Sequence, residues 1–267
     1  MNRIVIESPD NPRVRAWRKL ATPKGRAAAG AYFVEGPHLV EEAVRAGVPL
    51  ECVIAKKEHE SSPFLRSCTA PIVLVSDKVM RALSDTVTNQ GLAAICKMPD
   101  MAAFQPQPGC YLLLDGVQDP GNVGTMIRTA AAAGFLAVIT GLGSADAFAP
   151  KVVRAAQGAI FQIPVISGEL ADWLPALRRE GVVCLAAAAR EGRDFRSVEP
   201  ATNVGLVIGN EGAGVRPEVL ALCDEVVHIP MVGATESLSA PIAAGILMFH
   251  VALPHVPAAG MAFGGEG

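Results

Sequence analysis

The chain has 267 residues, of which 51% are hydrophobic, and carries a formal net charge of −3. This composition excludes a disordered chain and a protein that coats nucleic acid indiscriminately, and the length allows about two domains. The sequence has no apolar run of the about 18 residues that a membrane helix needs, and its N-terminus lacks the apolar core of a signal peptide. We therefore expect a cytoplasmic protein that does not enter a membrane.

Charge is distributed unevenly along the sequence. Residues 1–30 hold seven Lys or Arg against Glu7 and Asp10, a net charge of +5, so the remainder carries −8. A basic helical arm on an acidic body is a candidate phosphate-binding element, although a merely solvated basic helix would have the same composition. The candidate phosphate ligands on this arm are Arg13, Arg15, Arg18, Lys19 and Arg26.

Strands alternate with helices between residues 32 and 96. The expected strands are 32–36, 52–55, 72–75 and 91–96, and the expected helices are 38–46 and 79–83. This alternation predicts a small α/β domain over residues 1–97, including the basic arm. Residues 98–109 contain three prolines and no periodicity, and they are predicted to be a linker.

The six cysteines are scattered, with no CxxC pair and no histidine cluster beside them. They are Cys52, Cys68, Cys96, Cys110, Cys184 and Cys223. In a reducing compartment such residues are typically small core side chains and not disulfides or zinc ligands. We expect no metal site.

A second α/β domain is predicted over residues 110–253. Its expected strands are 111–117, 136–141, 162–165, 182–187, 204–209 and 225–230, with helices between most of them and a last helix at 238–252. These strands are apolar throughout and do not alternate, which is typical of a parallel sheet covered on both faces. Residues 254–267 have little to bury and are predicted to be a flexible tail.

The first chemically informative segment is the stretch from Tyr111 to Phe135. An apolar strand is followed by a tight turn at residues 119–122 and by a helix predicted over 125–133, which Gly134 would terminate. Ligands gather at such strand-to-helix turns in parallel sheets. Asn122 sits where a helix cap belongs, so capping is the alternative to a role in a site. Arg128 carries a long cationic side chain on an otherwise alanine-rich and apolar helix, which suggests that it binds a ligand.

Two further loops are rich in small residues. The strand at 204–209 leads into Gly209-Asn210-Glu211-Gly212-Ala213-Gly214, where glycines allow a close backbone approach and Glu211 could also accept hydrogen bonds from the turn itself. The loop is not GxGxxG, and no GxxxxGK[ST] occurs in the chain, so the common nucleotide fingerprints are absent from the sequence. The second loop, IPMVGATESLS at 229–239, precedes the last helix, and Ser237 or Ser239 could cap it.

Together these segments resemble a known family. DPGNVGTMIRTAAAAG (119–134), VIGNEGAG (207–214) and IPMVGATESLS (229–239) resemble the three motifs of the SpoU/TrmH RNA ribose 2′-O-methyltransferases of the SPOUT superfamily. PKVVRAAQGAIFQIPV (150–165) is similar to another stretch of that family. NPRVRAWRKL (11–20) and YFVEGPHLVEEA (32–43) resemble its L30e-like substrate-binding domain. The resemblance therefore spans nearly everything except the tail.

The resemblance implies a fold and a cofactor. It implies a C-terminal α/β domain with a trefoil knot, and a homodimer formed through the knot domains. S-adenosylmethionine would bind in the knot, largely to backbone groups, in a site lined by Gly209, Ile229, Met231 and Leu238. This cofactor brings an activated methyl group, so the protein must place the ribose oxygen and ease its proton loss.

The family's functional positions fall on Asn122, Arg128, Glu211 and Ser237. A guanidinium stays protonated in proteins, so Arg128 is expected to stabilise a developing alkoxide or hold the adjacent phosphate, and not to act as a base. Glu211 would orient Arg128. The family's third motif usually has Asn after the leucine, whereas this chain has Ser239, which makes activity less secure than fold.

The resemblance implies a transfer of methyl from S-adenosylmethionine to a ribose 2′-hydroxyl of structured RNA. Large-subunit (23S) ribosomal RNA is favoured over tRNA because the family's simplest tRNA enzymes lack the N-terminal domain. Alternatives are a tRNA methyltransferase, a catalytically impaired protein that binds S-adenosylmethionine and RNA on the ribosome, and an α/β enzyme for a small molecule. An antibiotic-resistance methyltransferase acting on the same RNA is a further subset.

Overall fold

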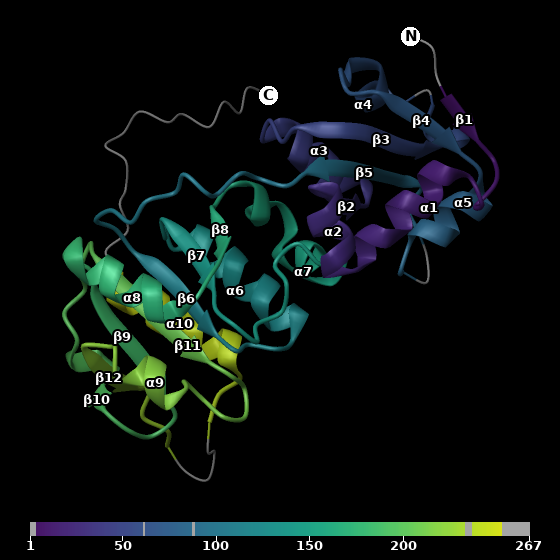
Figure 1. Ribbon diagram of the computed structural model, residues 1–267. Helices are drawn as coiled ribbons and strands as arrows, with labels where there is room; N and C mark the ends of the chain where they lie inside the picture. The colour runs from purple at the N-terminus through teal and green to yellow at the C-terminus, as the bar shows by residue number, and fades with distance from the viewer. Residues whose placement is uncertain (1–3, 61, 87–88, 233–236, 253–267) are drawn as a thin grey trace. The chain divides into compact units, whose positions relative to one another are not determined.

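A computed structural model describes residues 4–60, 62–86, 89–232 and 237–252. By its internal contacts the chain forms two compact units (Figure 1). The N-terminal unit consists of Met1–Ala103 and Ala145–Gln162, and the C-terminal unit of Phe104–Ser144 and Ile163–Gly267. The segment 145–162 therefore packs with the N-terminal unit, although sequence order had suggested that it belongs to the second domain.

The N-terminal unit is built on a five-stranded mixed sheet with the order β1-β4-β3-β5-β2. Parallel pairing joins β1 to β4 and β4 to β3, whereas β5 runs antiparallel to both β3 and β2. The strands are β1 Ile4–Ile6, β2 Ala31–Glu35, β3 Leu50–Lys56, β4 Ile72–Val75 and β5 Leu92–Lys97. The helices are α1 Pro12–Arg18, α2 Pro23–Ala29, α3 Pro37–Arg45, α4 Pro63–Ser67, α5 Asp77–Leu83 and α7 Pro150–Ala156. The predicted α/β alternation is thus present over residues 31–97.

The N-terminal arm is helical as expected, but it begins with a strand that was not predicted. Residues 4–6 form an edge strand through pairing with β4, and a three-residue apolar run is too short to predict such pairing from sequence. Asn11 caps α1 through a hydrogen bond from the Arg13 N–H at 2.9 Å, and Thr22 caps α2 in the same way. The helical part of the arm thus contains two helices that each begin at a proline.

The C-terminal unit contains a seven-stranded sheet with the order β10-β12-β9-β11-β6-β7-β8, and every neighbouring pair is parallel. The strands are β6 Tyr111–Asp115, β7 Ala137–Thr140, β8 Val165–Ser167, β9 Val183–Ala188, β10 Arg193–Asp194, β11 Val204–Gly209 and β12 Glu225–His228. The helices are α6 Pro120–Ala132, α8 Leu170–Arg179, α9 Pro217–Leu220 and α10 Ala240–Val251. The predicted parallel α/β sheet is confirmed (Figure 1).

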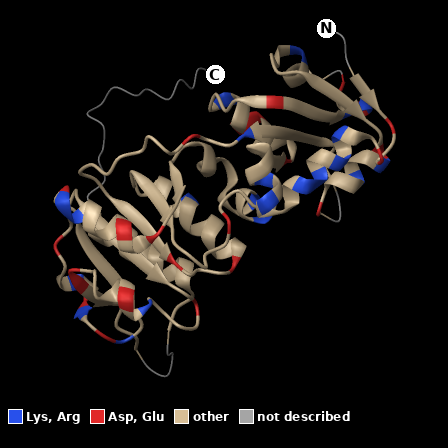
Figure 2. Cartoon of the chain, in the orientation of Figure 1, with Lys and Arg blue, Asp and Glu red and all other residues tan. Residues whose placement is uncertain are grey.

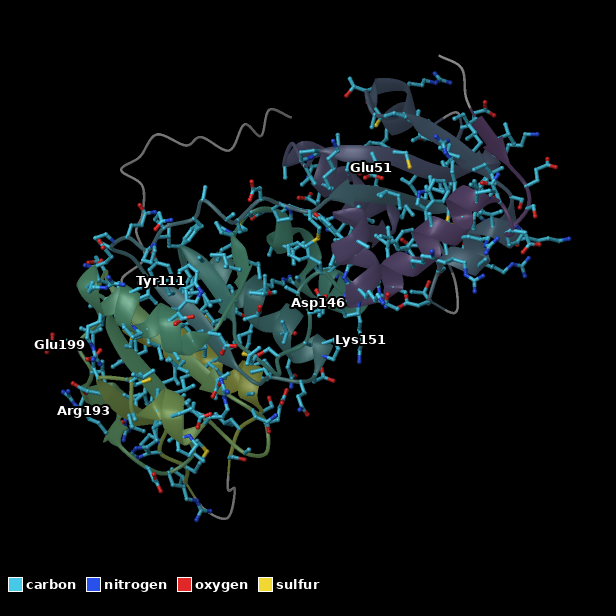
Figure 3. The ribbon with its side chains drawn as sticks, in the orientation of Figure 1. Glu51, Tyr111, Asp146, Lys151, Arg193 and Glu199 are labelled. Carbon is cyan, nitrogen blue, oxygen red and sulfur yellow. The ribbon has the colours of Figure 1, made fainter. Side chains whose placement is uncertain are left out.

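The central strands of this sheet are buried along their whole length. β6 begins at Tyr111 (Figure 3), and its residues, like those of β11, are all buried. This burial is the reason for their continuous apolar sequence. The prediction of a strand at 162–165 is wrong. Gln157–Phe161 forms a 3-10 helix, the Gln162 N–H donates to the Ala159 carbonyl at its end, and β8 begins only at Val165.

The cysteines behave as core residues. All six are free, and five of them are buried, with Cys223 partly exposed. Burial raises the pKa of the Cys96 and Cys184 thiols to about 12 in both cases, so these groups stay protonated and unreactive at neutral pH.

Candidate functional site

The site begins at the carboxyl ends of β6 and β11, which are neighbours in the sheet. Their register places Asp115 beside Gly209, so the turn before α6 and the glycine-rich loop after β11 leave the sheet at the same edge. In parallel sheets the loops at this edge form the ligand site. Two motifs separated by about ninety residues in the sequence are brought together by this single strand pairing.

A buried ion pair fastens the glycine-rich loop to β6. The Asp115 carboxylate has no solvent exposure and accepts hydrogen bonds from the Arg216 backbone N–H and Nε, both at 2.8 Å. Arg216 Nη2 lies 2.7 Å from the same carboxylate. Three contacts to one carboxylate fix the far end of the loop, because charge-assisted and bidentate bonds are the strong ones. Sequence analysis did not identify this pair.

The loop is closed by its own asparagine. Asn210 Oδ1 accepts hydrogen bonds from the backbone N–H groups of Gly212 and Ala213 at 2.9 and 3.0 Å, and its Nδ2 donates to the Gly116 carbonyl at 2.8 Å. Gly209 lies directly under the loop, since an added Cβ would come within 2.1 Å of the Gly214 carbonyl carbon. Glycine is therefore required at 209 for a close approach of backbone to backbone.

We expect Gly209→Ala to weaken S-adenosylmethionine binding by about tenfold or more, because the loop must move away to admit the methyl group. Isothermal titration checks this prediction. Gly245→Ala is the control, since Gly245 does not line the cavity and its added carbon would meet only Thr129 Cγ2 at 3.6 Å. Equal affinity of both variants would contradict the required close packing at Gly209.

Glu211 joins the glycine-rich loop to the start of α6. Its carboxylate accepts hydrogen bonds from Asn122 Nδ2 at 2.9 Å and from the backbone N–H groups of Gln118 and Asp119, both at 3.2 Å. Partial burial raises the pKa of Glu211, but these hydrogen bonds together outweigh it, so the pKa lies below the usual Glu value. Glu211 is therefore ionised at neutral pH and acts as an acceptor that holds two loops together, which makes it a poor proton acceptor for chemistry.

This lowered pKa predicts the pH dependence of the loop. The pKa of Glu211 is lower in the folded than in the unfolded protein. The ionised carboxylate therefore stabilises the two loops fully above the ordinary carboxyl pKa of about 4.3, and this stabilisation is lost as the pH falls through the folded-state pKa. We expect S-adenosylmethionine affinity to be flat between about pH 6 and pH 8 and to fall only in acid. Glu211→Gln should remove the acid-side fall, and a fall of equal size in this variant would contradict the assignment.

Two sequence expectations about these residues are wrong. Asn122 does not cap α6: Asp119 does, with its Oδ1 accepting from the Asn122 N–H at 3.0 Å. The reason is Pro120, which favours the first helical position and so leaves the cap to the residue before it. Glu211 does not orient Arg128, since the hydrogen bonds of its carboxylate go to Asn122 and the adjoining turn.

Arg128 lies on the exposed face of α6, opposite the buried residues Val123, Met126, Ile127 and Ala130. Within the described part of the chain its guanidinium forms no hydrogen bond and no ion pair. A guanidinium is always charged and offers five donors, so this side chain can hold an anionic group. The structure therefore leaves Arg128 available for a ligand.

A cavity of about 270 Å³ lies between the glycine-rich loop and the start of α10. All four residues expected to line the cofactor site, Gly209, Ile229, Met231 and Leu238, line it. Glu211 and Ser237 line the same cavity. Residues 233–236 of the third motif lie outside the described residues. Residues of the second and third motifs thus line one cavity, and the first motif is joined to it through the hydrogen bond from Asn122 to Glu211.

The cavity also has lining residues that sequence analysis missed. They include Ala187 and Ala188 at the end of β9, the following Ala189, Ile208 of β11, the loop residues Asn210, Gly212 and Gly214, and Ala240, Ala243 and Leu247 of α10. The alanine run carries no motif, and its role depends on β9 being next to β11, which the sequence does not encode. Apolar side chains and a glycine-rich backbone fit an adenosyl group, and the volume of the cavity lies just below the usual range for small-molecule sites.

Ser237 and Ser239 do not cap α10 through a hydroxyl among the described residues. Ser239 occupies the cap position, but its backbone carbonyl, and not its side chain, accepts from the Ile242 and Ala243 N–H groups at 3.0 Å. Pro241 lies in the first turn, where proline is compatible with a helix start. The hydroxyl of Ser237, which lines the cavity, is therefore not engaged in holding the helix.

The basic arm contains one residue that was wrongly assigned to a phosphate-binding surface. Arg26 is 2% exposed, donates from Nη1 to the Leu20 carbonyl at 2.7 Å and pairs through Nη2 with Asp146 at 2.5 Å (Figure 3). Arg26 thus holds the segment 145–162 inside the N-terminal unit and cannot contact RNA. The remaining four predicted residues, Arg13, Arg15, Arg18 and Lys19, are exposed along α1 and its C-terminal end, where Figure 2 shows Lys and Arg gathered.

A parallel α/β sheet with a loop-lined cavity at its carboxyl edge, joined to a smaller domain with a basic helix, defines the class of two-domain methyltransferases that modify RNA. The chain belongs to the SpoU rRNA methylase family, whose model matches residues 109–249. Residues 11–94 match the MRM3-like substrate binding domain. The resemblance seen in the sequence is thereby confirmed.

Individual relatives agree with this membership. The chain is 39% identical to the 23S rRNA (guanosine(2553)-2′-O)-methyltransferase RlmP of Bacillus subtilis, covering 92% of this chain and 98% of that protein. An RNA methyltransferase of the TrmH family from Porphyromonas gingivalis has a similar structure, with 33% identity, a TM-score of 0.79 and coverage of 91% and 98%. So does an AdoMet-bound rRNA methyltransferase from Sinorhizobium meliloti, with 29% identity, a TM-score of 0.83 and coverage of 93% and 97%.

Proposed function

We propose that this protein transfers a methyl group from S-adenosylmethionine to a ribose 2′-hydroxyl of large-subunit (23S) ribosomal RNA. The observation that carries the proposal is the convergence of the three motifs: Glu211 lines the cavity formed with the third motif and also binds Asn122 of α6. The similarity to the Bacillus subtilis enzyme over nearly the whole chain supports ribosomal RNA as the substrate and suggests guanosine as the first nucleotide to test.

In the proposed mechanism, Gly209, Ile229, Met231 and Leu238 hold the cofactor, which supplies an activated methyl group. Arg128 stabilises the oxygen of the ribose as its proton leaves, or holds the neighbouring phosphate. Its charge, its exposure and its freedom from other partners in the described chain suit both roles. Asn122 and Glu211 fix the two loops relative to each other, and Ser237 faces the cavity as a further positioning group.

Transfer of labelled methyl from S-adenosylmethionine to protein-free ribosomal RNA, followed by mapping of 2′-O-methyl sites, tests this function. We expect a single modified ribose in 23S RNA and none in tRNA. Modification of tRNA alone would support the alternative of a tRNA enzyme. Binding of S-adenosylmethionine without any methyl transfer would support the alternative of a catalytically impaired protein. That alternative was kept because Ser239 stands where the family usually has Asn.

We further propose that the protein is a homodimer formed through the C-terminal domain, which we expect to be knotted as in the family. The support is α10, which presents Ile242 (55% exposed), Ile246 (38%) and Phe249 (63%). These residues are spaced by four and three positions, so they form one apolar stripe on the helix. Exposed apolar stripes of this kind mark protein interfaces.

Phe249→Glu is expected to convert the dimer to a monomer, because a charge would be buried in the interface. Light scattering coupled to size-exclusion chromatography measures the mass. Leu142→Glu is the control, since Leu142 is similarly exposed at 57% and lies outside α10. A dimer that persists in Phe249→Glu, or a wild-type monomer, would refute the proposed interface.

We propose a cytoplasmic location, where ribosomal RNA is available. Among the described helices none is long and apolar enough to span a membrane. The exposed cations of α1 are proposed to contact the phosphates of the same RNA, because Arg and Lys on one helix face are the usual electrostatic footprint of such binding.

A further inference from the structure

The N-terminal unit contains a second cavity, which no motif predicted. It is an open groove of about 890 Å³ at the amino ends of three parallel strands. Ile4 of β1, Cys52 of β3 and Ile72 of β4 lie at these ends, and the strand register brings them to one edge of the sheet. Residues of α1 and the segment 65–71 form the walls of the groove.

The groove is apolar inside and basic at its sides. Ile4, Pro71 and Ile72 contribute apolar surface, and Trp17 lines the groove while packing in the core at 9% exposure. Among the described lining residues, Arg13 and Arg66 are cationic and Glu51 is the single carboxylate (Figure 3).

Both arginines are exposed, and neither forms an ion pair with a residue of the described chain. Arg13 and Cys52 both line the groove. Burial and, to a smaller extent, Glu51 raise the pKa of the Cys52 thiol, which Arg13 lowers, so that it lies at about 11. Two guanidinium groups without an ion-pair partner in the described chain, beside an apolar floor, match the chemistry of a nucleotide, with a phosphate for the cations and a base for the apolar surface.

We propose that this groove holds an unpaired nucleotide of the substrate RNA, next to the phosphates that α1 contacts. The proposal rests on the proposed function for the identity of the ligand as RNA. The volume is within the range of small-molecule sites, and Arg15, Arg18 and Lys19 extend the positive surface from Arg13 along the same helix. Structured RNA is recognised through such exposed, unstacked bases more than through its paired grooves.

The test measures binding of a 23S rRNA transcript and of a short, fully paired RNA duplex, without S-adenosylmethionine and over a range of salt concentrations. In Arg13→Gln/Arg66→Gln we expect affinity for the transcript to fall by about tenfold or more and the salt slope to decrease by about two. Arg45→Gln/Arg81→Gln is the matched control. Both control arginines are 69% exposed, belong to the same unit and pair with Glu42 and Asp77 respectively.

A second variant fills the groove and keeps its charge. Ala70→Leu places a larger side chain among the lining residues, and we expect about tenfold weaker binding of the transcript with unchanged binding of the duplex. Circular dichroism verifies that the variant is folded. The binding assays contain no methyl donor, so their result does not depend on catalysis. If the separate transfer assay showed no methyl transfer by the wild type, the proposed function would fail while the binding result would still stand.

Photo-crosslinking provides a readout that does not depend on affinity. With a benzophenone side chain at Thr69, an exposed residue of the groove, we expect crosslinks to one or two unpaired nucleotides of the transcript. The proposal is overturned if crosslinks fall only in paired regions or do not form, if the Arg13/Arg66 variant binds like its control, or if Ala70→Leu binds the transcript like the wild type. Crosslinking to a protein in place of RNA in assembled ribosomes would assign the groove to a protein partner and would also overturn it.

Discussion

Arg128→Ala is expected to reduce the rate of methyl transfer by about 10³-fold while leaving the affinity for S-adenosylmethionine unchanged. Removal of one donor from a charge-stabilising site typically has an effect of this size. Cofactor affinity should persist because the lining of the cavity comes from Gly209, Ile229, Met231, Leu238 and their neighbours, and does not include Arg128. Single-turnover transfer to ribosomal RNA and isothermal titration with the cofactor measure the two quantities separately.

Two further variants sharpen this test. Arg128→Lys keeps the charge but not the planar fork, so a large loss in this variant indicates bidentate contact, and a small loss indicates a point charge. Arg179→Ala removes an exposed arginine from α8 in the same unit and should leave transfer unchanged. Equal losses of transfer and cofactor binding in Arg128→Ala would show that the residue is structural, contrary to our account.

Arg216→Ala is expected to lower the free energy of unfolding of the C-terminal unit by about 3 kcal/mol, because it leaves the fully buried Asp115 carboxylate without its cation. Urea denaturation measures the change. The same variant should also weaken cofactor binding, since the loop that carries Asn210 and Glu211 loses its attachment to β6. The Arg216 side chain is itself more than one-third exposed, so the loss of stability arises from the buried Asp115 carboxylate that is left without a partner.

A double-mutant cycle identifies that cause. Asp115→Asn/Arg216→Ala should recover part of the stability lost in Arg216→Ala, because a neutral amide is much less costly to bury unpaired than a charge. Arg196→Ala is the surface control: Arg196 is exposed, and the loss of its ion pair with Asp194 should change the stability little because solvent screens it. A loss in Arg216→Ala no larger than that of this control would contradict a structural role for the buried pair.

The sequence carries more information about the elements and the cofactor residues than about the contacts among them. Continuous apolar runs predicted the buried parallel strands because both faces of the sheet are covered, as β6 and β11 are. The four positions proposed for the cofactor from the motifs lie together in one cavity. Family motifs therefore predicted residues that meet in space, and their contact with the cofactor stays a prediction.

Contacts between distant segments were beyond prediction. The Asp115–Arg216 pair, the position of the Ala187–Ala189 run and the burial of Arg26 against Asp146 all depend on strand order or on packing of remote segments. Arg26 is instructive because its sequence neighbours are exposed, and only the packing of residues 145–162 distinguishes it from them. Composition assigns a charge to a segment, whereas tertiary structure decides which charges remain on the surface.

The assignment of Glu211 changed for the same reason. Its motif suggested a partner for Arg128, but the register of β11 with β6 brings it to Asn122 and the turn before α6. This contact gives Glu211 a lowered pKa and a role in joining two loops, and it leaves Arg128 without a partner in the described chain. We therefore propose that the loops hold the methyl donor and that Arg128 acts on the substrate.

A crystal structure with S-adenosylhomocysteine tests most directly whether the separated motifs form one methyl-donor site. We predict that the adenosyl group occupies the cavity lined by Gly209, Ile229, Met231 and Leu238, with its sulfur directed toward the side of the site that carries Arg128. Binding of this molecule elsewhere on the protein, with that cavity empty at a saturating concentration, would contradict the account.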